Sequence, residues 1–162
     1  MKQLSKKTKL SLGIIICIII ISIVSIVLYL NSKSNNILFK SSYENYAWGA
    51  RSYGYYIYSN GDIKEYDNYD NDRKLKSAKI SSEELTQLKE LAGMVEDKYE
   101  VDTSMGQMFD AGTSTEQIYN SKLSKWVILS KFGDSMSRNS TETSQKILEL
   151  TNQLYNKYLN EN

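Results

Sequence analysis

The sequence predicts an α+β domain of the order ββαββα, with an antiparallel sheet and its helices on one face, preceded by a transmembrane helix. Three observations lead to this fold class. Residues 10–30 form one uncharged apolar run, Asn60-Gly61 joins two tyrosine-rich strands, and each of two amphipathic helices follows a pair of strands. Helices that follow hairpins are typical of sheets covered on a single face.

The apolar run at residues 10–30 is the strongest signal in the chain. A helix of that length spans about 30 Å, the hydrocarbon thickness of a bilayer. Four lysines and no acidic residue precede it, whereas only Lys33 and Lys40 follow it closely. Because positive charge stays on the cytoplasmic side, residues 1–9 are expected to be a cytoplasmic tail and residues 31–162 to lie outside. The expected location is the cell membrane, with a single integral span.

Two other interpretations of this segment remain open. A cleaved secretory signal has a shorter apolar core, of about 7–15 residues, but Ser32 and Ser34 offer small residues for cleavage. A lipoprotein signal would use Cys17 as the acylated residue, yet isoleucines stand before it where a small residue is required. A retained anchor fits the length of the run better than either.

Composition excludes several classes of function. The 162 residues include no histidine, no proline and one cysteine, with a formal net charge of +1. No internal disulfide or cysteine-rich zinc site can form, and the commonest general base is missing. The N-terminal lysines more than account for the net charge, so the exported part is slightly acidic, which argues against nucleic acid as a partner. The Ile, Lys, Asn and Tyr bias suggests a low-GC Gram-positive bacterium.

Residues 31–42 are expected to be a polar linker, and residues 43–162 the extracytoplasmic domain. Within that domain, residues 55–59 and 62–66 are predicted strands joined by Asn60-Gly61. This dipeptide is typical of a two-residue type I′ turn, which would set Tyr58 opposite Ile63 and Tyr55 opposite Tyr66. A charged loop over residues 67–76 follows.

Ser81 and Glu84 form the capping-box pattern that predicts a helix over residues 81–95. Residues 96–106 are expected to be a polar connection. Two further strands are predicted at residues 114–120 and 126–129, and a second helix from residue 140 or 141 to residue 158. An apolar residue recurs every three or four positions in both helices, so each has one inward face.

No constellation of residues predicts catalysis or a cofactor. Residues 67–72 are rich in carboxylate and amide oxygens, but the spacing does not match a calcium-binding EF-hand loop, and Arg73 and Lys74 follow directly. Asp110 precedes Ala111-Gly112 and Asp134 follows Gly133, and aspartate commonly stabilises turns at such positions. Phosphate-binding loops and serine-nucleophile motifs are absent from the sequence. We therefore expect no metal, no cofactor and no enzymatic activity.

The segment of residues 54–61, Gly-Tyr-Tyr-Ile-Tyr-Ser-Asn-Gly, resembles one repeat of the choline- and glucan-binding modules of bacterial cell walls. In those modules, aromatic rings hold a quaternary ammonium or stack on sugars. The candidate binding residues are Tyr55, Tyr56 and Tyr58 of this segment, together with the nearby Trp48. Those modules bind between tandem repeats, whereas this chain has one such segment, and the tyrosines can equally serve to pack the sheet.

A second resemblance covers the C-terminal half, through Asp110-Ala111-Gly112-Thr113, Ile118-Tyr119-Asn120, Trp126-Val127-Ile128-Leu129 and Gly133-Asp134. This half resembles small uncharacterised exported proteins of low-GC Gram-positive bacteria. The ββαββα order is also similar to that of emfourin-type metalloprotease inhibitors, although their Gly-rich N-terminal motif has no counterpart here. The expected function is a non-catalytic, membrane-tethered interaction module for another envelope protein. The alternatives are cell-wall glycan or choline binding through the tyrosine hairpin, and inhibition of an exported protease.

Overall fold

The computed structural model describes residues 18–25, 36–47, 49–102, 112–133 and 136–160. The chain divides into two units, residues 1–36 and residues 37–162. In the first unit residues 18–25 are helical, and the Ser22 hydroxyl donates to the Ile18 carbonyl oxygen at 2.9 Å. Among the described residues, no helix combines the length and the apolar character needed to cross a membrane. The predicted transmembrane helix therefore has no counterpart among the described residues, and most of residues 10–30, like the predicted tail, lie outside them.

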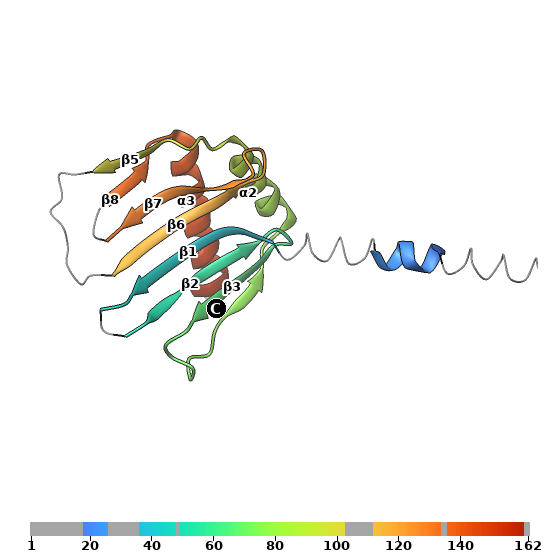
Figure 1. The fold of residues 1–162 in the computed structure, drawn as a ribbon, viewed down its shortest axis with the longest axis horizontal. Helices are drawn as coiled ribbons and strands as arrows, with labels where there is room; N and C mark the ends of the chain where they lie inside the picture. The colour runs from blue at the N-terminus through green and yellow to red at the C-terminus, as the bar shows by residue number, and fades with distance from the viewer. Residues whose placement is uncertain (1–17, 26–35, 48, 103–111, 134–135, 161–162) are drawn as a thin grey trace, which may run out of the picture. The chain divides into compact units, whose positions relative to one another are not determined.

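The unit of residues 37–162 is built on one eight-stranded antiparallel sheet with the strand order β4-β3-β2-β1-β6-β7-β8-β5 (Figure 1). The predicted ββαββα order is therefore wrong, because four strands precede each helix. The strands are β1 (Ile37–Asn45), β2 (Arg51–Tyr58), β3 (Asp62–Asp67), β4 (Ser77–Lys79), β5 (Tyr99–Asp102), β6 (Thr113–Asn120), β7 (Lys125–Phe132) and β8 (Met136–Asn139).

Four of these strands, β1, β4, β5 and β8, fall where the sequence predicted none. Residues 37–42, expected to belong to the linker, form most of β1, which pairs with β2 on one side and β6 on the other. β5 lies in the expected polar connection and pairs with β8 at one edge of the sheet. β4 is a short strand at the opposite edge, next to β3. The strand that joins the two halves of the sheet is thus one that the sequence pattern did not reveal.

The turn between β2 and β3 is longer by one residue than the predicted type I′ turn. Gly61 donates its backbone N–H to the Tyr58 carbonyl oxygen at 2.9 Å, and its φ is +90°, whereas Asn60 has no positive φ. This geometry is typical of a three-residue hairpin loop, in which a glycine follows a type I turn. The register consequently shifts by one, and Tyr55 lies opposite Glu65 rather than Tyr66.

The two helices begin where the sequence predicts. α2 (Ser82–Met94) starts at the capping box, in which the Ser81 and Glu84 side chains each accept from the other's backbone N–H. α3 (Glu142–Tyr155) is capped by Thr141 and continues as the π-helix η1 (Asn156–Asn160). Figure 1 shows α3 running across one face of the sheet, with α2 beside it.

A row of apolar side chains from five neighbouring strands forms the core beneath the helices. Cross-strand partners share a face of the sheet, and the paired residues of this row are all fully buried: Ile63, Ile57, Phe39, Ile118 and Val127. Leu88 of α2 and Ile147 and Leu154 of α3 close the core from the helical side. The folded domain therefore has one continuous hydrophobic core without disulfides.

Candidate functional site

The helix-facing side of the sheet changes character two residues beyond the apolar row. Side chains that are two positions apart in a strand lie on the same face, so the next row also faces α3. This row consists of Glu65, Tyr55, Ser41, Glu116 and Ser130, each opposite its neighbour across β3, β2, β1, β6 and β7. In β7 a register shift places Ser130, three positions after Val127, opposite Glu116. The following row is Asp67, Tyr53, Tyr43, Ser114 and Phe132. A surface that a helix normally seals with apolar groups is here polar and aromatic.

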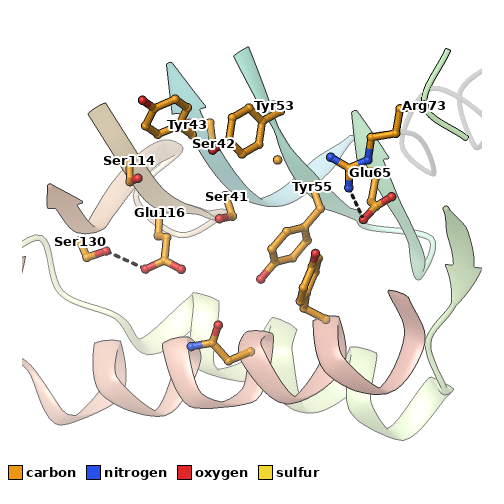
Figure 2. A pocket seen from close by; sticks show the side chains of 13 residues that line it. Ser41, Ser42, Tyr43, Tyr53, Tyr55, Glu65, Arg73, Ser114, Glu116 and Ser130 are labelled. Carbon is orange, nitrogen blue, oxygen red and sulfur yellow. Dashed lines mark hydrogen bonds and ion pairs between the residues drawn. The ribbon is translucent and has the colours of Figure 1, made fainter. Parts of the chain in front are cut away.

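Most residues of these two rows, together with α3, line a partly open cavity of about 620 Å³ (Figure 2). The serines of the lining are small, which leaves the volume unfilled, and Asn152 and Tyr155 complete the lining from α3. Ligand pockets for small molecules typically measure about 300–1,000 Å³. We refer to this cavity as the sheet–α3 pocket.

On the β3 side of the pocket, Arg73 is held by two carboxylates. Its guanidinium lies 3.2 Å from Glu65 Oε1 and 3.5 Å from Asp67 Oδ2. Both acidic side chains are buried, with 7% and 3% of their side-chain area exposed. Glu65 also accepts the Lys76 backbone N–H at 3.0 Å. The positive charge of Arg73 is therefore committed to the protein's own carboxylates.

On the opposite side, Glu116 places a half-buried carboxylate in the pocket. The Ser130 hydroxyl donates to its Oε2 at 2.7 Å. Figure 2 shows the Glu116 carboxylate directed into the space between the sheet and α3, while Glu65 turns toward Arg73. Within the described part of the chain, no lysine or arginine forms an ion pair with Glu116. The negative charge of Glu116 is thus not neutralised by an ion pair with any described residue.

Aromatic rings form the centre of the pocket. The Tyr55 ring lies 4.8 Å from the Tyr155 ring, centroid to centroid, and its hydroxyl donates to the Thr151 carbonyl oxygen at 3.3 Å. Burial raises the pKa of the Tyr55 hydroxyl, and the negative charge of Glu116 raises this pKa further. Tyr55 is therefore a neutral hydrogen-bond donor throughout the physiological pH range. Tyr43 and Tyr53 form a second ring pair at 4.9 Å.

The structure separates the candidate residues that the sequence grouped together. Tyr55 lines the sheet–α3 pocket. Because neighbouring residues of a strand point to opposite faces, Tyr56 and Tyr58 lie on the other face of the sheet. There the Tyr56 ring stacks on Tyr66 at 4.4 Å and meets Tyr58 edge-on at 6.2 Å. Trp48 lies outside the described residues.

Sequence reasoning missed the pocket residues of β1, β6 and α3, above all Glu116. One signal was available, because Glu116 stands two positions before the apolar Ile118 in a predicted strand and so falls on the core-facing side. A charged residue at such a position points to a polar site. Ser41 offered no comparable signal, since its strand was itself not predicted.

The acidic loop after β3 uses its carboxylates for local structure. Asp67 accepts the backbone N–H groups of Tyr69 and Asp70 at 2.9 and 3.2 Å, and Asp70 accepts those of Asp72 and Arg73. The Tyr69 N–H holds the pKa of Asp67 below its usual value, and Arg73 lowers this pKa further. Asp110 and Asp134, the other acidic turn residues considered from the sequence, lie outside the described residues.

Comparison with known proteins adds no relative to this picture. No protein family, characterised protein sequence or solved structure matches the chain. Its function is therefore inferred from the chemistry of the sheet–α3 pocket.

Proposed function

We propose that the folded domain is a non-catalytic interaction module, and that the sheet–α3 pocket receives a small ligand or a protruding group of its partner. The observation that carries this proposal is the change from an apolar to a polar row where α3 still covers the sheet. Filling that space with apolar side chains would stabilise the fold at about 25 cal/mol per Å² of surface buried. The chain instead places serines and a carboxylate there.

The arrangement of the pocket's acidic groups supports binding rather than hydrolysis. Glu65 and Glu116 are three strand spacings apart, or about 14 Å between backbones at about 4.8 Å per spacing. A pair of glycosidase carboxylates is held about 5–9.5 Å apart across the bond that breaks. Glu65 is moreover engaged by Arg73, and Glu116 by Ser130. Glu65 and Glu116 therefore do not face each other at the distance that a general acid and a general base require, and the lining is better suited to binding.

The place of action is proposed from the sequence alone. The apolar residues 10–30 and the lysines before them favour export of the domain across the cytoplasmic membrane. A partner in the cell envelope follows from that location. Two alternatives stay predictions from the sequence: glycan or choline binding through the tyrosine hairpin, and inhibition of an exported protease.

The proposal is tested by screening the full chain, in a neutral detergent, against cationic, anionic and uncharged small molecules by ligand-observed NMR. Ser41 lies in the middle of the pocket row, so Ser41→Leu fills the space and should abolish every pocket-dependent signal. Ser52→Leu places the same side chain on the opposite face of β2 and should leave the signals unchanged. Compounds that bind the Ser41→Leu chain as well as the native chain would show that the pocket is not the binding site.

A further inference from the structure

We infer that the sheet–α3 pocket takes a small organic cation, that is, an ammonium group carried on a compact carbon skeleton. This inference rests on the proposed function, because it names the ligand class of the same pocket. Within the described part of the chain, the pocket lining holds two glutamates and one arginine, and the arginine is already paired with Glu65 and Asp67. The charge left facing the cavity is the carboxylate of Glu116.

An anionic ligand does not fit this distribution of charge. A bound carboxylate or phosphate would need positive donors, and Arg73, the arginine of the described lining, already donates to two buried carboxylates on the β3 side. The anion would also meet Glu116 in a partly enclosed space, where charges are less screened than in water. A cation at the same place would instead be attracted by the Glu116 carboxylate.

The aromatic walls favour a cation independently of the carboxylate. The face of a tyrosine ring is electronegative and attracts a cation within about 6 Å of its centroid. Four tyrosine rings line the pocket as the pairs Tyr55–Tyr155 and Tyr43–Tyr53, with centroids 4.8 and 4.9 Å apart. Each ring turns part of one face to its partner, so a cation would lie against the ring surfaces that the pairs leave toward the pocket. The chain already uses this chemistry in the next row, where the Arg51 guanidinium carbon lies 5.4 Å from the Tyr53 ring centroid.

An uncharged ligand of the same shape would lose the contribution of Glu116 and keep only contact with the rings. Choline and its carbon analogue 3,3-dimethylbutan-1-ol differ by one positive charge at nearly equal volume. Isothermal titration of the full chain should give an affinity at least tenfold higher for choline. Butylammonium, which carries N–H donors, is titrated alongside to distinguish a quaternary from a primary ammonium ligand.

Two variants test whether Glu116 causes the preference for choline over the uncharged analogue. Glu116→Gln keeps the shape and an oxygen for Ser130, and should lower choline affinity at least tenfold while leaving the affinity for the uncharged analogue unchanged. Glu149→Gln removes the same charge from the exposed side of α3 and should change neither value. In the native chain, choline affinity should fall as salt concentration rises, because salt screens the attraction between charges, which tests the inference without any variant.

The outcomes separate this inference from the proposed function. Equal affinity for choline, butylammonium and the uncharged analogue, or no loss of choline affinity in Glu116→Gln, would overturn the cation assignment. If a neutral or anionic compound bound in a manner abolished by Ser41→Leu, the pocket would still be a binding site and only its ligand class would be wrong. If no compound bound through the pocket, both proposals would fail.

Discussion

Glu84 connects the first turn of α2 to the C-terminal π-helix η1, and its charge should contribute measurably to folding. Its carboxylate accepts from the Lys157 ammonium at 2.8 Å, from the Tyr158 hydroxyl at 2.8 Å and from the Ser81 backbone N–H at 3.0 Å. Burial alone would raise the pKa of this carboxyl, but the hydrogen bonds from Lys157, Tyr158 and Ser81 outweigh burial and lower the pKa to about 2. The perturbation that tests this contact is Glu84→Gln, which removes the charge and keeps an oxygen for the cap.

The size of the effect follows from the displaced pKa. A shift of one unit corresponds to about 1.4 kcal/mol, so the fall from 4.5 to about 2 sets an upper bound of about 3 kcal/mol. The side chain keeps 22% of its area exposed, and water and salt reduce the value of such ion pairs. We expect Glu84→Gln to lower the free energy of unfolding by about 1–2 kcal/mol at pH 7.

The sign of the pH dependence is fixed because the folded-state pKa lies below the unfolded one. The stabilisation is fully present above pH 4.5 and is lost as the pH falls from 4.5 to about 2. Urea unfolding of the native and Glu84→Gln chains should therefore give a difference that is constant from pH 7 to pH 5 and vanishes near pH 2. Glu83→Gln changes the same charge one residue earlier and serves as the control for the helix dipole. A difference that is equal at pH 7 and pH 2, or matched by Glu83→Gln, would refute the reasoning.

Three further substitutions test the sheet and core. Gly54→Ala should destabilise the fold by more than 1 kcal/mol in urea unfolding, because an added Cβ would overlap the Ser41 carbonyl oxygen. Asn120→Ala should cost about 1–3 kcal/mol, since the buried amide donates to the Val95 carbonyl oxygen at 2.9 Å. Phe39→Ala should cost about 3–5 kcal/mol by leaving a cavity in the fully buried row, with a matching drop in thermal midpoint.

Local signals in the sequence predicted local structure well. The capping box of Ser81 and Glu84 marked the start of α2, because both hydrogen bonds lie within one turn of chain. The hairpin between β2 and β3 was also predicted, but its register was not. One additional residue in the turn separates a type I′ turn from a type I turn followed by a glycine, and composition does not distinguish them.

Strand β1 and the pocket were both missed in the sequence for the same physical reason. β1 alternates Phe39, Ser41 and Tyr43 toward α3, and only the first of these is fully buried. A strand is recognised by regular apolar alternation, and the serine that opens the pocket breaks that pattern. The apolar alternation that identifies a strand is thus lost where the chain departs from ordinary core packing. Such departures are common at functional sites.

The most direct test of the central claim is a titration of the isotope-labelled full chain with choline, followed by amide chemical shifts in two-dimensional NMR. A ligand in the sheet–α3 pocket should shift resonances along the row of Tyr55, Ser41 and Glu116 and at Tyr155 of α3. The amides of α2, which lie apart from the pocket lining, should stay in place. Shifts confined to the Tyr56, Tyr58 and Tyr66 cluster on the opposite face, or no shifts at all, would contradict the assignment of the pocket as a cation site.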